Sequence, residues 1–271
     1  MIHFLRGSRG PTVPLVRLVG TIGMATGLRP GLSLSAVGTA LRRAFTTKGP
    51  AVALVVNSPG GSPAQSSLIF KRVRALAEEH DKEVLVFVED VAASGGYWLA
   101  VAGDEVFVDA TSILGSIGVI SASFGFTELL DKIGVERRVY TSGTNKSILD
   151  PFKPEKDEDI AILKGVQADI HTAFVDAVKA RRGPRLSDDP DLFTGRFWSG
   201  TNAISLGLAD AIGDSHTVLR ERFGEKVVIK AIPVGRPSLL RRRLGLAGAA
   251  GLGEDFIAAA RADQMWARYG L

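Results

Sequence analysis

The chain has 271 residues, of which 45% are apolar and 23% are charged. This composition suits a buried core in one large or two small domains, and it excludes a generally disordered chain. The absence of cysteine excludes disulfides and cysteine-ligated metal sites. The net charge of +4 is mildly basic, and part of the excess lies in Arg241–Arg243. We expect this cluster to face solvent or anionic lipid, and we expect no nucleic-acid partner.

The first dozen residues include Arg6, Arg9 and Pro11 and contain no long apolar run. This pattern predicts neither a signal peptide nor a membrane span at this end. The apolar stretches elsewhere have the length of strands, and Leu244–Leu252 is too short to cross a bilayer. We therefore expect a cytoplasmic protein, with peripheral contact to a membrane as a further expectation.

Strand-like and helix-like segments alternate along the chain. Val13–Gly20 predicts a strand, and Ser33–Phe45 predicts a helix with Ser33 as its N-cap. The continuous apolar run Ala51–Asn57 predicts a strand buried on both faces, as in a parallel sheet. A serine and a proline at Ser62 and Pro63 then predict a helix start. This helix is expected to end near His80, with core positions Leu68, Ile69, Val73 and Leu76.

The same unit of strand, turn and helix then recurs. Glu83–Glu89 predicts a second buried strand, and a glycine turn leads from it into a short helix over Gly95–Ala102. The further elements expected are strands at Glu105–Val108 and Val135–Tyr140 and helices at Phe126–Ile133 and Glu155–Arg182. Repeated units of this kind predict an α/β fold with helices packed on sheets.

We expect two parts along the chain. Residues 1–234 are predicted to form the main domain. Residues 235–271 are predicted to form a basic C-terminal appendage, rich in glycine and alanine, with one late helix over Glu254–Tyr269.

Two glycine-rich turns each follow a buried strand, and they are the strongest candidates for a functional site. The first is Asn57–Ser62 (N-S-P-G-G-S), and the second is Ala92–Trp98 (A-A-S-G-G-Y-W). A hydroxyl at Ser94 would lie in the positive field of a helix N-terminus, and backbone N–H groups from both turns could form an oxyanion hole. The equally weighted alternative is that Ser94 is only an N-cap and the glycines only make turns.

A nucleophilic serine needs a base, and histidine is a poor candidate here. The four histidines are His3, His80, His171 and His216, and none of them lies in a motif typical of a catalytic triad. A lysine can replace histidine when burial favours its neutral amine. Lys146 lies in a polar loop after a predicted strand, where a solvated surface lysine is the ordinary interpretation.

Seven short motifs, in order, resemble the signal peptide peptidase A family of serine peptidases. They run from Val16–Ile22 and the two glycine turns through G-S-I-G-V (Gly115–Val119) and S-G-x-x-K (Ser142–Lys146). They end with F-V-D-A-V and the stretch Gly195–Asp210. The resemblance covers roughly Val13 to Gly213 and implies a crotonase-like or Clp-like fold of repeated ββα units, with helices on mostly parallel sheets.

The resemblance also implies roles for individual residues. Ser94 falls on the family's nucleophile and Lys146 on its base, which makes a Ser–Lys dyad. Ser116 falls on a serine that orients the lysine amine, although a capping or turn serine is an equal alternative. Gly95 and Gly61 match the oxyanion donors, and Gly60 is a further candidate. We expect neither a cofactor nor a metal site.

The first functional hypothesis is a serine endopeptidase that cleaves extended, largely apolar peptides through an acyl-enzyme, with signal-peptide remnants among the expected substrates. Members of this length build ring-like homo-oligomers, which we also expect here. The alternatives are a crotonase-type acyl-CoA enzyme, which shares the oxyanion hole but needs no nucleophilic serine, and a noncatalytic assembly protein. Ser94 together with Lys146 favours the peptidase.

Overall fold

The computed structural model describes residues 10–23, 31–235, 260 and 262–271. Contacts divide the chain into two compact units. The core unit comprises Met1–Ile117 and Val175–Leu271, and the inserted unit comprises Gly118–Phe174. Each unit is described here by itself.

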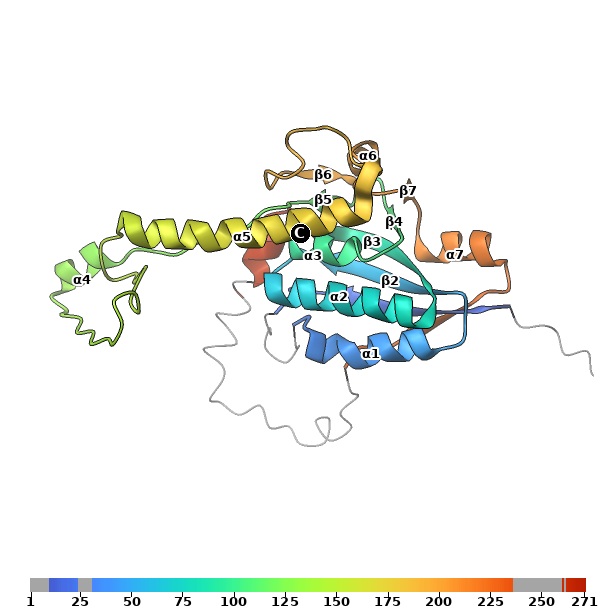
Figure 1. Cartoon of the computed structure of the whole chain (residues 1–271), viewed down its shortest axis with the longest axis horizontal. Helices are drawn as coiled ribbons and strands as arrows, with labels where there is room; N and C mark the ends of the chain where they lie inside the picture. The colour runs from blue at the N-terminus through green and yellow to red at the C-terminus, as the bar shows by residue number, and fades with distance from the viewer. Residues whose placement is uncertain (1–9, 24–30, 236–259, 261) are drawn as a thin grey trace, which may run out of the picture. The chain divides into compact units, whose positions relative to one another are not determined.

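One sheet organises the core unit, with eight strands in the described part of the chain (Figure 1). Its main order is β6-β5-β3-β2-β1-β8, and β4 pairs with β3 and β7 beside this path. All pairs are parallel except β5 with β6. The strands are β1 (Thr12–Val19), β2 (Ala51–Ser58), β3 (Glu83–Ala93), β4 (Glu105–Val108), β5 (Ile113–Gly115), β6 (Phe197–Ser199), β7 (Ala211–Ile212) and β8 (Val228–Ile232).

The central strand β2 explains why the sheet is parallel and covered on both faces. Every residue of β2 is buried, and the strand pairs in parallel with β1 and β3. A strand without polar alternation needs a cover on each face, which crossover helices provide. The predicted mixed α/β fold with a mostly parallel sheet is therefore confirmed.

Helices cover both faces of the sheet in the core unit. On one face α1, α2 and α3 pack together and against β1, β2 and β3, and on the other face Leu219 of α7 joins the cluster of β1, β2, β3 and β4 side chains. The helices of the described residues are α1 (Leu34–Thr46), α2 (Pro63–His80), α3 (Gly95–Ala100), α4 (Thr127–Ile133), α5 (Asp157–Arg182), α6 (Gly200–Ser205) and α7 (Ser215–Phe223), with a 3-10 turn at Gly183–Arg185.

The predicted serine-capped starts of α1 and α2 are confirmed. Ser33 accepts a hydrogen bond from the Ala36 amide at 3.3 Å and caps α1. Ser62 accepts from the Gln65 amide at 3.4 Å, and Pro63 is the first residue of α2. These hydroxyls satisfy amides that have no partner inside the helix, so the sequence signal reports a real physical need.

Two detailed predictions are wrong. Val135–Tyr140 forms no strand, because its centre is charged and Arg137 turns instead to Asp150 in an ion pair. Leu68 is not a core residue, since its side chain is 43% exposed. The buried stripe of α2 runs through Ser66, Ile69, Val73 and Leu76, and Leu68 lies to the side of that stripe.

The end of α5 is fixed to the core unit by charged side chains. Arg182, which is 2% exposed, donates to the carboxylate of Asp210 at 2.7 Å and to the Gly207 carbonyl at 2.7 Å. Arg181 donates to Asp104 at 2.7 Å. Burial alone would raise the pKa of each aspartate, but hydrogen bonds and the arginine charges outweigh it and lower both pKa values.

The predicted division at residue 235 stays a prediction. Most of the expected appendage, residues 236–259 and 261, lies outside the described residues. Of the late helix expected over Glu254–Tyr269, residues 260 and 262–269 are described: 260 and 262–267 are helical, whereas Arg268 and Tyr269 form a turn.

Candidate active site

Ser94 occupies a strained turn between β3 and α3. Its backbone has φ 52° and ψ −124°, a conformation that non-glycine residues rarely adopt. The Ser94 amide donates to the Gly115 carbonyl at 2.8 Å, which ties the turn to the end of β5. The Ser94 hydroxyl makes no capping hydrogen bond to α3. Ser94 thus stands at the N-cap position of α3 without acting as a side-chain cap, and strain of this kind is typical of functional sites.

The two predicted glycine turns lie against each other. A methyl group placed on Gly60 would lie 2.9 Å from the Ser94 Cβ and 2.9 Å from the Gly95 amide nitrogen. A methyl group placed on Gly95 would lie 3.4 Å from the Gly61 amide nitrogen. Only glycine permits this approach, since Gly60 and Gly61 also have φ values of 103° and 141°.

The backbone amides of the two glycine turns differ in whether they already donate a hydrogen bond within the protein. The Gly60 amide donates to the buried Ser58 hydroxyl at 3.2 Å. Within the described residues, neither the Gly61 amide nor the Gly95 amide has an acceptor in the protein. Of the two first-turn candidates, Gly61 is thus the better donor to a ligand. Two free amides from neighbouring turns form an arrangement that can stabilise an oxyanion.

Asn57 and Asp90 bridge a register change between β2 and β3 just before the two glycine turns, and the sequence prediction gave them no role. The β2–β3 register changes here, because Val56 pairs with Val88 whereas Ser58 pairs with Ala92. The Asn57 side chain bridges the extra residues, donating to Asp90 and accepting from the Val91 amide at 3.3 Å. An amide residue at the end of a wholly apolar strand was the available signal.

Ser116 lies next to this turn through the backbone. It follows Gly115, the residue that accepts from the Ser94 amide, and its own amide donates to the Arg196 carbonyl at 2.7 Å. Ser116 is 4% exposed and has φ 51°, so it is a second strained serine in the same place. No helix starts at Ser116, which excludes the capping alternative and leaves the turn alternative.

Tyr97 anchors α3, the helix that follows the Ser94 turn. Its buried hydroxyl donates to the Leu208 carbonyl at 2.8 Å. Burial raises the pKa of this hydroxyl far above its ordinary value, so Tyr97 stays neutral and acts as an anchor.

Lys146 belongs to the inserted unit. It lies in a turn where its amide donates to the Gly143 carbonyl at 3.3 Å, and its side chain is exposed in the single chain. Asp150, the nearest acid along the sequence, is paired with Arg137 and also accepts from the Phe152 amide at 3.1 Å. These bonds lower the pKa of Asp150 and direct its carboxylate to Arg137.

The inserted unit exposes an unusual number of apolar side chains. Tyr140 is 91% exposed and Phe124 is 76% exposed. Other exposed large apolar residues described in this unit are Ile120, Phe126, Leu129, Ile133, Val135, Ile162 and Val166. From Gly118 to Ala173 no residue is buried, so the unit has no core of its own.

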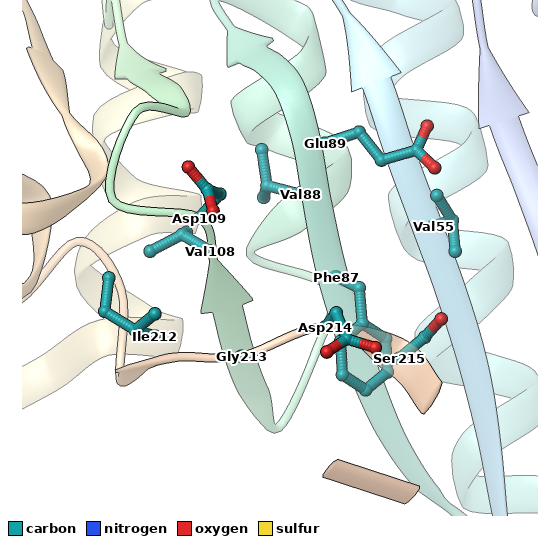
Figure 2. Close-up of a pocket in the computed structure, with 10 residues that line it drawn as sticks. All are labelled: Val55, Phe87, Val88, Glu89, Val108, Asp109, Ile212, Gly213, Asp214 and Ser215. Carbon is teal, nitrogen blue, oxygen red and sulfur yellow. The ribbon is translucent and has the colours of Figure 1, made fainter. Parts of the chain in front are cut away.

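A separate cavity of about 310 Å³ lies on the α7 face of the sheet (Figure 2). Its walls are apolar at Val55, Phe87 and Ile212, and carboxylates of Asp109 and Asp214 line it. Neither Ser94 nor a residue of the glycine turns lines this cavity. No group of three or more potential metal-binding side chains occurs among the described residues.

Comparisons with known proteins match a peptidase family model and several relatives. The model of peptidase family S49 matches residues 77–228. The chloroplastic serine protease SPPA of Arabidopsis thaliana is 33% identical over 162 residues, which cover 58% of this chain and 23% of that protein. Protease 4 of Haemophilus influenzae is 34% identical over 166 residues, covering 60% of this chain and 26% of that protein.

A third relative has a name of another kind. The Na⁺/H⁺ antiporter NhaA of Brucella abortus is 55% identical over 271 residues, which cover 96% of this chain and 37% of that protein. The chain thus spans between about a quarter and just over a third of these three relatives. Among the described helices, none is long and apolar enough to cross a membrane.

Proposed function

Because the chain belongs to peptidase family S49, we propose that it is a serine peptidase with Ser94 as the nucleophile. The observation that carries this proposal is the Ser94 turn. Its serine has a strained backbone and a hydroxyl that makes no capping hydrogen bond, and it lies beside the amides of Gly61 and Gly95, which have no acceptor within the described residues. A strained backbone costs free energy and clusters at functional sites, whereas a turn with only a structural role gains nothing from it.

The proposed reaction passes through an acyl-enzyme. The Ser94 Oγ forms a bond to the peptide carbonyl carbon while Lys146 Nζ takes the hydroxyl proton. The tetrahedral intermediate then breaks its C–N bond, and Lys146 returns the proton to the leaving amine. Water, deprotonated by Lys146 Nζ, then attacks the ester carbonyl carbon. The second tetrahedral intermediate breaks its bond to Ser94 Oγ, which takes the proton back from Lys146, and the acid is released. This chemistry requires no cofactor.

Backbone amides supply the charge stabilisation in this scheme. The amides of Gly95 and Gly61 are assigned to the developing oxyanion, because both are free and their turns touch. Gly60 contributes mainly by holding the turn, since its own amide is bonded to Ser58. Donors of this kind act without reorganisation at the moment of reaction.

Lys146 must be neutral to accept a proton, and burial is what favours the neutral amine. Its side chain is exposed in the single chain, so the proposal requires a further cover. We assign that cover to a second copy of the chain in a ring-like homo-oligomer, because the inserted unit exposes apolar side chains and has no core. Ser116 is assigned to orient the amine.

The proposed substrates are extended, largely apolar peptides, and the names of the plant and Haemophilus relatives support proteolysis. Remnants of signal peptides are the specific substrates we propose. The parallel sheet with two glycine turns at the ends of β2 and β3 supports a crotonase-like or Clp-like fold. We propose a cytoplasmic location with peripheral contact to a membrane.

The crotonase-type acyl-CoA alternative would use the same amides without Ser94. A noncatalytic assembly protein would use neither. The strained backbone of Ser94 favours the peptidase over both, since neither alternative needs a serine at that position.

Hydrolysis of a labelled apolar peptide by the purified protein tests the proposal. Ser94→Ala is expected to remove turnover while circular dichroism stays unchanged. Ser205→Ala is the matched control, because this exposed serine on α6 lies outside the glycine turns and its hydroxyl donates to the Asn202 carbonyl of the same helix. Turnover in Ser94→Ala equal to that of the control would refute the assignment.

A further inference from the structure

The last residues of the chain pack on the end of the strand that leads to Ser94. Tyr269, which is 8% exposed, forms a buried cluster with Val91 and Ala93 of β3. Ile113 of β5 and Trp266 pack against the same cluster. The described C-terminal segment, residues 262–271, is drawn in red in Figure 1.

Tyr269 also reaches the strand on the far side of β5. Its ring meets Phe197 of β6 edge-on, with ring centroids 5.2 Å apart. Phe197 pairs with Gly115, and Gly115 pairs with Ala93. The Gly115 carbonyl is the acceptor of the Ser94 amide. The hydrogen bond from the Ser94 amide to the Gly115 carbonyl holds the Ser94 turn. Tyr269 therefore contacts Ala93, which precedes Ser94, and Phe197, which pairs with Gly115.

The segment holds this position by local bonds of its own. The Tyr269 amide donates to the Trp266 carbonyl at 2.9 Å, and the Leu271 amide donates to the same carbonyl at 3.3 Å. These bonds close a turn after the helical residues 262–267. The aromatic side chains at positions 266 and 269 are thereby presented together to the β3–β5–β6 edge.

From this packing we infer that residues 262–271 form a positioning element for Ser94, which we name the C-terminal clamp. It acts through Ala93 and Gly115 and touches no reacting atom. The inference rests on the proposed role of Ser94 as nucleophile. Residues held at positive φ persist only when their surroundings over-determine them, and the clamp supplies part of that surrounding. The clamp lies outside residues 77–228, which match the family model.

The test compares Tyr269→Ser with Tyr269→Phe. The serine variant removes the ring, whereas phenylalanine keeps the ring and its edge contact with Phe197. Gln264→Ala, an exposed position of the same segment, is the surface control. Rates of reaction with a fluorophosphonate probe and values of kcat and KM are measured for all variants well below their melting temperatures.

Tyr269→Ser is expected to slow probe reaction and kcat by about tenfold or more with KM little changed, because small misplacements of a reacting group are costly. Tyr269→Phe and Gln264→Ala are expected to match the unmodified protein. Unchanged rates in Tyr269→Ser would overturn the inference, even if its melting temperature falls. If Tyr269→Ser does not fold, Phe197→Leu weakens the same contact while keeping apolar bulk, and unchanged rates in it would count equally against the clamp.

Hydrogen exchange separates failure of the clamp from failure of the proposed function. The Ser94 amide is bonded to Gly115, so its exchange reports the turn directly. Faster exchange at Ser94 in Tyr269→Ser than in Tyr269→Phe supports the clamp even if no variant reacts with the probe. Equal exchange in the two variants contradicts the clamp whatever the activity.

Discussion

In the core unit, β2 is buried along its whole length, whereas in the inserted unit every residue from Gly118 to Ala173 is at least partly exposed. The proposed nucleophile, Ser94, belongs to the core unit, and the proposed base, Lys146, belongs to the inserted unit. The surroundings of Ser94 are fixed by β3, β5 and the glycine turns within the core unit. The inserted unit lacks a core of its own, so the environment of Lys146 depends on what covers that unit.

Within the inserted unit, the largest predicted effect is at the proposed base. Lys146→Arg should lower peptide turnover by about 10²–10⁴-fold, because guanidinium stays protonated and cannot act as a general base. The measurement is kcat on a labelled apolar peptide. Lys153→Arg, another lysine of the inserted unit, is the control and should keep wild-type turnover. A Lys146→Arg variant with unchanged kcat would mean that another group is the base.

The next effect concerns assembly. Phe124→Ser combined with Tyr140→Ser should convert the oligomer to a monomer and reduce turnover roughly tenfold or more, because the base loses its cover. Light scattering and turnover are measured on the same samples. Leu68→Ser, an exposed apolar position of the core unit, is the control and should change neither. A monomer with full turnover would show that catalysis does not require the oligomer, and it would refute the proposed ring as the cover of Lys146.

Substitutions in the core unit should change the free energy of unfolding rather than the oligomeric state. Asp210→Ala leaves Arg182 buried without its carboxylate and is expected to lower the free energy of unfolding by about 3 kcal/mol, the lower end of the range for broken buried pairs, since Asp210 is partly exposed. Denaturant titration measures this change. A loss below about 0.5 kcal/mol would show that the Arg182–Asp210 ion pair at the end of α5 contributes little to stability.

The same anchor predicts a pH dependence. The pKa values of Asp104 and Asp210 are lowered in the folded protein, so the unfolded chain binds protons first as the pH falls. The contribution of these carboxylates is complete above about pH 4 to 5 and is lost as the pH falls through the lowered folded values. Asp210→Asn should therefore flatten the acid limb of a plot of stability against pH.

The smallest predicted effect is at the start of α7. Asp214 accepts from the His216 amide at 2.8 Å and the Thr217 amide at 3.0 Å. Asp214→Ala should cost about 1 kcal/mol of unfolding free energy, whereas Asp214→Asn keeps the cap and should cost less. Thermal unfolding of the two variants distinguishes these outcomes, and equal losses would show that the cap itself is unimportant.

Much of the core unit could be predicted from sequence, because its signals are local. The apolar run of β2, the serine caps of α1 and α2 and the glycine turns each reflect a physical need of nearby backbone. The false strand at Val135–Tyr140 arose where apolar residues flank a charged centre, and Arg137 found a partner in Asp150 instead.

The remaining features depend on contacts between segments that are distant in sequence. The Asn57 bridge to Asp90 requires knowledge of the β2–β3 register, and the Tyr269 contact with Phe197 joins residues 72 positions apart. Neither has a periodic pattern in the sequence. For the same reason the occupied amide of Gly60 and the free amide of Gly61 could be distinguished only in the structure.

The most direct test of the Ser–Lys assignment is to map the adduct of a fluorophosphonate probe by mass spectrometry in the unmodified protein and in Lys146→Ala. The proposal predicts a single adduct on the peptide that contains Ser94, formed at least about a hundredfold more slowly in Lys146→Ala. An adduct on another serine, or one on Ser94 that forms at the same rate without Lys146, would contradict it.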